Sequence, residues 1–296
     1  MYPAPFEYHR AASVADALAL MERYGDEGKV LAGGHSLLPV MKLRFASPAH
    51  LIDIGRIAAL SGISESGGHL VIGAMTKHAE VASSPVVARI GAAVSDAAAL
   101  IGDVQVRNRG TLGGSLAHAD PGADLPAVML ALDARIVATG TSGDRLIAAD
   151  AYFTGTFATS LGAGELVTEV RIPQAAPGSG SAYVKHADAA SGYAVVGVAA
   201  LVTVAGGTVS AVRVAITGLS SMATRLTAVE AALVGQPASE VAVATAASAA
   251  SLGLDLYDDA QGSAAYKAHL VTVYAARALT QAVARALTPA QAPATA

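Results

Sequence analysis

The sequence has 296 residues, of which 53% are hydrophobic and 14% are charged, and its formal net charge is −4. This apolar content excludes a disordered chain. The weakly acidic balance provides no basic footprint for nucleic acid or an anionic membrane, so we expect neither as a partner. Cysteine is absent, which excludes disulfides, thiolate catalysis and cysteine-held iron–sulfur clusters within this chain. Redox chemistry here would need a bound organic cofactor.

Neither a membrane-spanning segment nor an export signal is predicted. The longest apolar run, Tyr193 to Ala205, is shorter than the ~18 to 20 residues that cross a bilayer. The N-terminal stretch MYPAPFEYHR lacks the basic region and the apolar region of a secretory signal. We therefore expect a cytoplasmic protein.

A small α/β unit is predicted for residues 1–56. Ser13 with Asp16 three positions later indicates a helix N-terminus, and Gly25 marks the end of that helix. The pattern then predicts a short buried strand, a helix and a second strand, over Lys29–Ala32, Leu37–Leu43 and His50–Ile54.

A middle region follows over residues 57–176. Glycine-containing turns at Ser66–Gly68 and Thr141–Gly143 predict two hairpins. The apolar patterns predict two helices and a strand, over Gly91–Ile101, Asp124–Leu132 and Glu165–Ile172. With the first unit, this region would form an N-terminal domain of residues 1–176.

A C-terminal domain is predicted over residues 181–287, after a linker at Pro177–Ser181. Its first feature is a hairpin of Ala194–Val204 and Val209–Thr217 across the pair Gly206-Gly207. Three helices are expected after the hairpin, over Leu226–Val234, Glu240–Ser251 and Tyr266–Leu287. The tail, residues 288–296, is expected to be disordered.

Two glycine-rich motifs carry the strongest functional signal: Ala32-Gly33-Gly34-His35-Ser36 and Thr111-Leu112-Gly113-Gly114-Ser115. Adjacent glycines let the backbone take positive φ and approach a ligand closely, and successive N–H groups can then converge on an anion. The first motif lies between a predicted strand and a predicted helix, the arrangement that a phosphate site needs. A Gly-Gly pair is also typical of a tight turn. Neither motif is a Walker A loop or a Rossmann fingerprint, so a nucleotide fold of another kind is required.

Other polar groups allow more than one interpretation. His35 could have a binding role, as a donor to phosphate or as a neighbour of a flavin edge. It could also be a surface loop histidine without a partner. His118, Asp120 and Asp124 are metal-ligand types, but the Pro-Gly pair between them favours a loop leading into a helix that begins near Asp124. The polar run Gln105–Arg109 is either a solvated surface or a contact to pyrophosphate or a partner subunit.

Three residues after the linker have no clear role by themselves. Tyr183 and Lys185 alternate, so they could share one face of a strand, and Tyr193 directly precedes a buried strand. No Ser-His-Asp grouping or pair of carboxylates can be recognised by spacing, which leaves hydrolysis without support.

The motif AGGHS after a strand, TLGGS in the middle region, and YVK followed by SGYAVVGVAA together resemble the FAD-binding medium subunit of molybdenum-containing hydroxylases, the xanthine dehydrogenase family. The likeness spans nearly the whole chain. The length, the AGGHS form and the stretch LAHADPGAD are most similar to the flavoprotein subunit of aerobic carbon monoxide dehydrogenase. The resemblance implies an α+β fold with a two-part FAD-binding domain of the vanillyl-alcohol oxidase (PCMH) type. A C-terminal domain with a small antiparallel sheet and helices would follow.

The resemblance also implies an FAD site. The two glycine motifs would hold the pyrophosphate and neighbouring parts of FAD, mostly through backbone N–H groups. Asp124 would bind a polar portion of the cofactor, and Ser115 stands where many relatives have asparagine, so its side-chain contact is expected to differ. No residue would act as acid, base or nucleophile. The remaining implied cofactor residues are Ile101 and Val167, which would pack on FAD, and Lys185 and Tyr193, which would lie near the isoalloxazine.

By the same resemblance, the chain is an electron-transfer subunit. A large subunit would oxidise the substrate at a molybdopterin cofactor, and the [2Fe-2S] clusters of a small subunit would pass electrons to FAD and on to an external acceptor, expected to be a quinone. The implied assembly is a dimer of heterotrimers, a heterohexamer, with peripheral attachment to the inner membrane.

Three alternatives stay open at this point. The chain could be the medium subunit of a related xanthine, aldehyde or N-heterocycle dehydrogenase. It could be a self-contained flavin oxidoreductase, although its alanine-rich C-terminal part is poor in groups for a substrate pocket. It could also be a non-enzymatic nucleotide-binding protein, which would be colourless.

Overall fold

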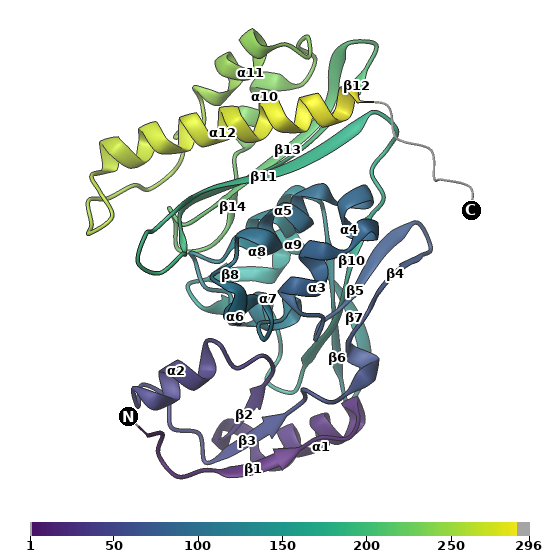
Figure 1. Cartoon of the computed structure of the whole chain (residues 1–296), viewed down its shortest axis with the longest axis vertical. Coiled ribbons are helices and arrows are strands. Elements are labelled where there is room, and N and C mark those ends of the chain that lie inside the picture. The colour runs from purple at the N-terminus through teal and green to yellow at the C-terminus, as the bar shows by residue number, and fades with distance from the viewer. Residues whose placement is uncertain (1, 289–296) are drawn as a thin grey trace.

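The computed structural model describes residues 2–288 (Figure 1). The expected disorder of the tail therefore lies, except for Thr288, outside the described residues. Among the residues described, no helix has both the length and the apolar character needed to span a bilayer.

The N-terminal unit is built on a three-stranded parallel sheet in the order β1-β3-β2. The helix predicted after Ser13 is present, because the Ser13 hydroxyl accepts a hydrogen bond from the N–H of Asp16 at 3.1 Å and Gly25 caps the other end. Strand β1 was not expected from the sequence. The elements are β1 (Glu7–Arg10), α1 (Val14–Tyr24), η1 (Gly25–Glu27), β2 (Gly28–Leu31), α2 (Leu37–Lys42), β3 (His50–Asp53) and η2 (Ala58–Leu60).

The middle region contains a five-stranded antiparallel sheet in the order β4-β5-β10-β6-β7 and a two-stranded sheet of β8 and β9. Both predicted hairpins, β4–β5 and β6–β7, are confirmed. The strands are β4 (Ile63–Ser66), β5 (His69–Gly73), β6 (Arg135–Gly140), β7 (Gly143–Ala148), β8 (Phe153–Gly155), β9 (Ala158–Thr159) and β10 (Leu166–Pro173).

The helices of the middle region pack tightly because several of them present small apolar side chains. Every residue of α8 is buried, and Ala93, Ala97 and Ala98 of α5 are fully buried. The helices are α3 (His78–Ser83), α4 (Pro85–Ile90), α5 (Ala92–Leu100), α6 (Val104–Arg107), α7 (Leu112–His118), α8 (Asp124–Ala131) and α9 (Ala149–Tyr152).

The C-terminal part is a four-stranded antiparallel sheet between two layers of helices (Figure 1). Helix α12 packs on one face of β11 and β12, while α5 and α8 of the middle region pack on the other. The predicted hairpin is β12–β13. The elements are β11 (Ser179–Ala187), β12 (Ala194–Ala205), β13 (Thr208–Thr217), β14 (Thr224–Arg225), α10 (Thr227–Leu233), α11 (Glu240–Ala247) and α12 (Ala264–Leu287).

The predicted linker is shorter than expected, because its last residues belong to β11. Ser179 pairs with Thr203 across the sheet. Gly180 is small for a packing reason, since a Cβ there would lie 2.3 Å from the carbonyl oxygen of Ala282 in α12. From the sequence alone, a glycine that is required for close contact with a helix cannot be distinguished from a glycine of a flexible linker.

The C-terminal sheet shares its core with the middle region. Tyr183, Ala199 and Ala215 belong to the same buried cluster as the residues of α5 and α8. At the edge of this contact, Arg285 of α12 donates to Asp96 of α5 at 2.6 Å. This packing fixes the loop between β11 and β12 relative to the glycine motifs.

Candidate functional site

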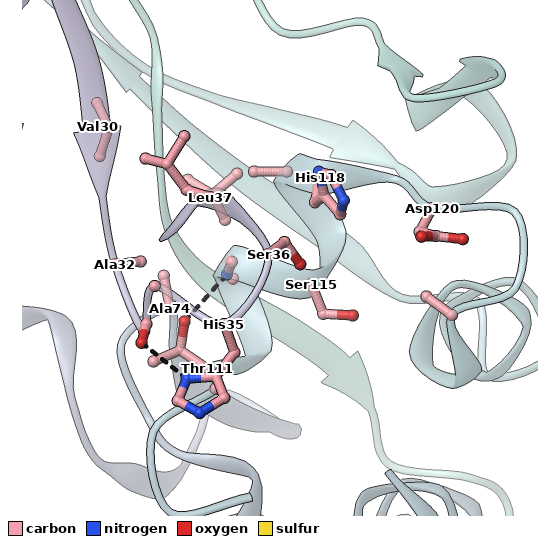
Figure 2. Close-up of a pocket in the computed structure, with 18 of the residues that line it drawn as sticks. Val30, Ala32, His35, Ser36, Leu37, Ala74, Thr111, Ser115, His118 and Asp120 are labelled. Atoms are coloured by element: carbon pink, nitrogen blue, oxygen red, sulfur yellow. Dashed lines mark hydrogen bonds between the residues drawn. The ribbon is translucent and has the colours of Figure 1, made fainter. Parts of the chain in front are cut away.

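A cavity of about 690 Å³ is lined by the N-terminal unit, the middle region and the β11–β12 loop. This size is typical of cofactor and small-molecule sites. Figure 2 shows that side chains from both glycine motifs lie around it. All residues expected at the cofactor line the cavity except Leu112 and Lys185: these are Ala32, Gly33, Gly34, His35, Ser36, Ile101, Thr111, Gly113, Gly114, Ser115, Asp124, Val167 and Tyr193.

The first glycine motif is a turn between β2 and α2 with a row of free donors. Gly34 has φ of 79°, the left-handed conformation that favours glycine. Within residues 2–288, the N–H groups of Gly33, Gly34, His35 and Ser36 have no hydrogen-bond acceptor. Successive unpaired N–H groups at a cavity wall are suited to an anion such as a phosphate. The side chain of His35 folds back, with Nδ1 3.2 Å from the carbonyl oxygen of Gly33 (Figure 2).

The second glycine motif is the first turn of helix α7, with Thr111 as its N-cap. Four of its five N–H groups, those of Leu112 to Ser115, already have acceptors within the chain. Leu112 donates to the carbonyl of Thr76, Gly113 to that of Ala74, Gly114 to the Thr111 hydroxyl and Ser115 to the carbonyl of Thr111, at 2.8–3.2 Å. Backbone donors without an acceptor, which the resemblance implies for the two motifs together, are therefore found mainly in the first motif. The Ser115 hydroxyl has no partner among the described residues and lines the cavity.

Glycines in the motifs bring separate segments together. A Cβ at Gly33 would lie 2.2 Å from the carbonyl oxygen of Arg109, just before the second motif. A Cβ at Gly113 would lie 2.4 Å from the Cβ of Ala74. The glycines at these positions are thus needed for contact between segments, and only Gly34 of the motif glycines has positive φ.

Asp124 is held by two residues of β11. It begins α8 and accepts hydrogen bonds from the Tyr183 hydroxyl at 2.6 Å and from Nζ of Lys185 at 3.0 Å. Tyr183 and Lys185 share a face of β11, as their alternation predicted. Lys185 also donates to the carbonyl of Leu100 at 2.9 Å and does not line the cavity. Burial raises the pKa of Asp124, while the charge of Lys185 and the Tyr183 hydroxyl oppose that rise.

Apolar and aromatic groups complete the wall. Val167 of β10 lies beside a bulge in the pairing with β6, and Ile101 follows α5. Tyr193 lies in the β11–β12 loop, is 42% exposed and packs close to Gly122. Partial burial raises the pKa of the Tyr193 hydroxyl. Leu112 points away from the cavity and is fully buried in the core.

His78, which no sequence pattern indicated, is the most distinctive additional residue of the cavity. It begins α3, is 4% exposed, and its Nδ1 is buried without a hydrogen-bond partner in the described part of the chain. Burial, with a smaller effect of His35, lowers its pKa to about 4, so the imidazole is neutral at pH 7. The bridge between Lys77 and Thr111 brings it to the second motif, a contact that no local spacing reveals.

The other polar candidates separate into two groups. His118 and Asp120 line the cavity (Figure 2), and Asp120 accepts from the N–H of Gly122 at 2.8 Å in the predicted loop before α8. Arg107 instead donates to the carbonyls of Ile101 and Gly102 at 3.0 Å. Arg109 lines a separate cavity of about 260 Å³, which also contains Arg10 and Arg56.

These features fit FAD. Its pyrophosphate needs anion-binding donors, which the Gly33–Ser36 turn provides, and its ring system needs an apolar wall, which Ile101 and Val167 provide. The partnerless Nδ1 of His78 and hydroxyl of Ser115 are available to a polar cofactor atom. The Nδ1 of His78 is buried, and an orphaned buried polar atom of this kind indicates a missing partner, whereas the Ser115 hydroxyl is half-buried.

Comparison with known proteins agrees with this fit. A family model described as the FAD binding domain in molybdopterin dehydrogenase matches residues 4–175, and one described as the CO dehydrogenase flavoprotein C-terminal domain matches residues 181–282. The carbon monoxide dehydrogenase medium chain of Hydrogenophaga pseudoflava is 45% identical over 90% of this chain and 93% of its own. Subunit alpha of the 6-hydroxypseudooxynicotine dehydrogenase complex of Paenarthrobacter nicotinovorans is 40% identical over 92% of each chain.

A solved structure shows the same architecture. A chain of the carbon monoxide dehydrogenase of Hydrogenophaga pseudoflava superposes with a TM-score of 0.92 and 46% identity, covering 96% of this chain and 99% of that one. The predicted two-part FAD-binding domain and C-terminal flavoprotein domain are confirmed. The chain belongs to the family of FAD-binding medium subunits of molybdopterin-containing dehydrogenases, of the carbon monoxide dehydrogenase flavoprotein type.

Proposed function

We propose that this chain is the medium subunit of a carbon monoxide dehydrogenase and carries electrons between its partner subunits and an external acceptor. The supporting observation is the full-length similarity to a carbon monoxide dehydrogenase medium chain, at 45% identity in sequence and a TM-score of 0.92 in structure. A relative of similar length and 40% identity serves a 6-hydroxypseudooxynicotine dehydrogenase complex. The electron-transfer role that we propose does not depend on the substrate, which we expect another chain of the complex to bind.

Residues of this chain would bind and orient FAD. The free N–H groups of Gly33–Ser36 would hold the pyrophosphate, with the Ser115 hydroxyl beside them. Ile101, Val167 and Tyr193 would pack along the cofactor and exclude water. Asp124, fixed by Lys185, would accept from a polar portion of FAD. FAD, when bound, exchanges electrons singly or in pairs, which suits a junction between one-electron centres and a two-electron acceptor.

We further propose two kinds of partner, a small iron–sulfur subunit and a large molybdopterin subunit, in a cytoplasmic dimer of heterotrimers. A quinone at the inner membrane is the proposed acceptor. The absence of cysteine supports the placement of the clusters in another chain. Leu43 and Phe45, which are 49% and 82% exposed next to α2, offer apolar surface for a partner.

The testing experiment is substrate reduction of the bound flavin in the intact complex from the native host. Anaerobic carbon monoxide should bleach the flavin absorbance, and a quinone analogue should restore it. Bleaching by an aldehyde, purine or N-heterocycle, but not by carbon monoxide, would assign the chain to a related dehydrogenase. Reduction of the separated flavin-loaded chain by substrate would show a self-contained oxidoreductase, and an intact complex without flavin would overturn the proposal.

A further inference from the structure

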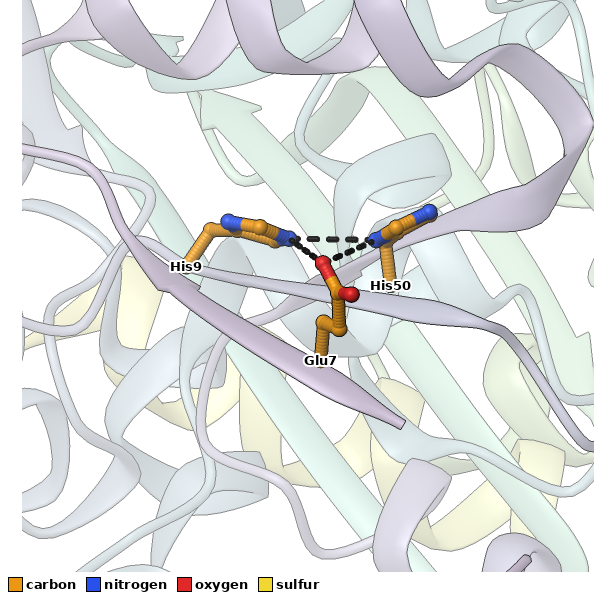
Figure 3. Close-up of side chains that lie close together, drawn as sticks. All are labelled: Glu7, His9 and His50. Carbon is orange, nitrogen blue, oxygen red and sulfur yellow. Dashed lines mark hydrogen bonds and ion pairs between the residues drawn. The ribbon is translucent and has the colours of Figure 1, made fainter. Parts of the chain in front are cut away.

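A second group of ligand-type side chains lies on the N-terminal sheet. Glu7 and His9 alternate along β1, and Glu7 pairs with His50 of β3 in the parallel register. All three side chains therefore lie on one face of the sheet, and Figure 3 shows them converging. None of them lines the cofactor cavity. Among residues 2–288, this is the one group of three such side chains whose ligand atoms lie within 4.8 Å of one another.

The three ligand atoms form a triangle of the size that a metal ion requires. Nε2 of His9 lies 3.1 Å from Nδ1 of His50, and Oε2 of Glu7 lies 3.8 Å and 3.5 Å from these two nitrogens. Tetrahedral zinc with bonds of about 2.0–2.2 Å places its ligand atoms about 3.4 Å apart. The carboxylate distances are too long for hydrogen bonds. One cation at the centre of the triangle would satisfy all three groups.

The histidine rings are held in place before any ion binds. The ring of Tyr24 stacks on His9 with centroids 4.6 Å apart and on His50 with centroids 3.8 Å apart. The histidine side chains are only 21% and 17% exposed, whereas that of Glu7 is 72% exposed. The rings thus form a rigid base, and the open carboxylate side gives an ion access and leaves room for water as a fourth ligand.

We propose that Glu7, His9 and His50 bind a divalent transition-metal ion, with zinc as the expected occupant. Two imidazoles and one carboxylate suit zinc, cobalt, nickel or copper, whereas magnesium and calcium prefer oxygen ligands. The ion would link β1 to β3 and so hold the N-terminal strand on the sheet. Binding to the folded state alone would raise the thermal stability of the chain.

The test uses zinc and cobalt(II) on the full-length flavin-loaded protein after treatment with a chelator. Calorimetry should show one zinc per chain, cobalt(II) should give a tetrahedral ligand-field spectrum in the flavin-subtracted difference, and zinc should raise Tm. Separate His9→Gln and His50→Gln variants should each bind zinc at least about tenfold more weakly. His269→Gln, at an exposed histidine of α12, is the matched control and should bind as the wild type does.

A variant of the exposed Glu7 tests the site without the risk that a changed histidine ring disturbs the fold. Glu7→Gln leaves the stacked rings untouched, so it should fold normally, lose the zinc-dependent rise in Tm and weaken zinc binding. The proposal would be overturned if the wild type did not bind zinc, or if the Glu7, His9 and His50 variants bound zinc as tightly as the wild type. His9 and His50 would then be only a hydrogen-bonded pair.

Discussion

Nζ of Lys185 lies 2.9 Å from Oδ1 of Asp124, and the two side chains are only 2% and 5% exposed. The lysine comes from β11 and the aspartate begins α8, so this buried ion pair joins the C-terminal sheet to the helix that borders the cavity. The pair is a structural link as well as the neighbour of the proposed cofactor. Its two roles can be separated by experiment.

Replacement of Lys185 by methionine should strongly destabilise the chain, because Asp124 would keep a buried charge without its partner. Loss of one member of a buried pair costs about 3–5 kcal/mol. Urea unfolding of the wild type and the variant would measure this difference as a free energy of unfolding. The loss should shrink at acidic pH, because protonation removes the unpaired charge of Asp124. The control is Lys185→Met combined with Asp124→Asn, which should recover part of the stability. A double variant that is no more stable than the single one would contradict this account.

Gly33→Ala should damage both the fold around the cavity and FAD retention. The new Cβ would lie 2.2 Å from the carbonyl oxygen of Arg109 and would push the first motif away from the second. Overpacking of this kind costs about 1–3 kcal/mol, and we expect at least about a tenfold loss of FAD affinity. The measurements are Tm and FAD titration after cofactor removal.

Gly164→Ala is the matched control for Gly33→Ala. A Cβ at Gly164 meets no atom within 4 Å, and its backbone is not left-handed. Wild-type FAD affinity and Tm are expected for this control. Equal behaviour of the two alanine variants would show that contact between the motifs does not shape the site.

Local sequence patterns predicted most helices and hairpins, because caps and turn glycines act within a few residues. The capping by Ser13 and the Gly206-Gly207 turn are examples. The family resemblance supplied the overall fold and the cofactor, which no spacing could give. It also pointed to residues from three parts of the chain, most of which line one cavity in the structure.

The remaining features depend on contacts that are distant in sequence. His78 reaches the cavity through pairing beside Thr111, and the N–H groups of Leu112 and Gly113 are taken by carbonyls of Thr76 and Ala74. The sequence predicts that Gly180 belongs to a linker, whereas in the structure this glycine allows the backbone of α12 to approach β11 closely. In each case the role of the residue depends on a segment that is distant in sequence, so the residues next to it in the chain do not reveal that role.

Glu165, beside the cavity, should make stability depend on acidic pH. Arg145 donates to both its carboxylate oxygens at 2.6 Å, and this contact, helped by the N–H of Gly162, lowers the pKa of Glu165 from 4.5 to about 2. The stabilising contribution is complete above the unfolded pKa of 4.5 and disappears as pH falls toward about 2. The stability difference between wild type and Glu165→Gln, from urea unfolding, should therefore shrink over this range.

Glu27→Gln provides the control for the Glu165 experiment, because Glu27 is exposed and has no ion pair within residues 2–288. Its difference from the wild type should stay small across the same pH range. If the Glu165→Gln difference stays constant between pH 5 and about 2, the paired carboxylate does not contribute in the way described.

His78→Leu should separate cofactor binding from folding. The buried Nδ1 of His78 has no partner among the described residues, and such an atom costs the fold about 1–3 kcal/mol. Removing it should leave the stability of the FAD-free chain unchanged or raised, whereas loss of a hydrogen bond to FAD should weaken FAD binding about tenfold. Because burial lowers the His78 pKa from 6.5 to about 4, the unfolded chain binds the extra proton over this range, so the wild type should lose stability relative to the variant as pH falls.

The measurements for His78→Leu are FAD titration of the stripped chain and urea unfolding without FAD. His269→Leu, at an exposed position on α12, serves as the control and should match the wild type in both. A variant that binds FAD normally but unfolds more easily would show that His78 only fills space. Weaker FAD binding with unchanged or raised stability would instead identify its imidazole as a cofactor contact, since a residue that only fills space would lower the stability when it is replaced.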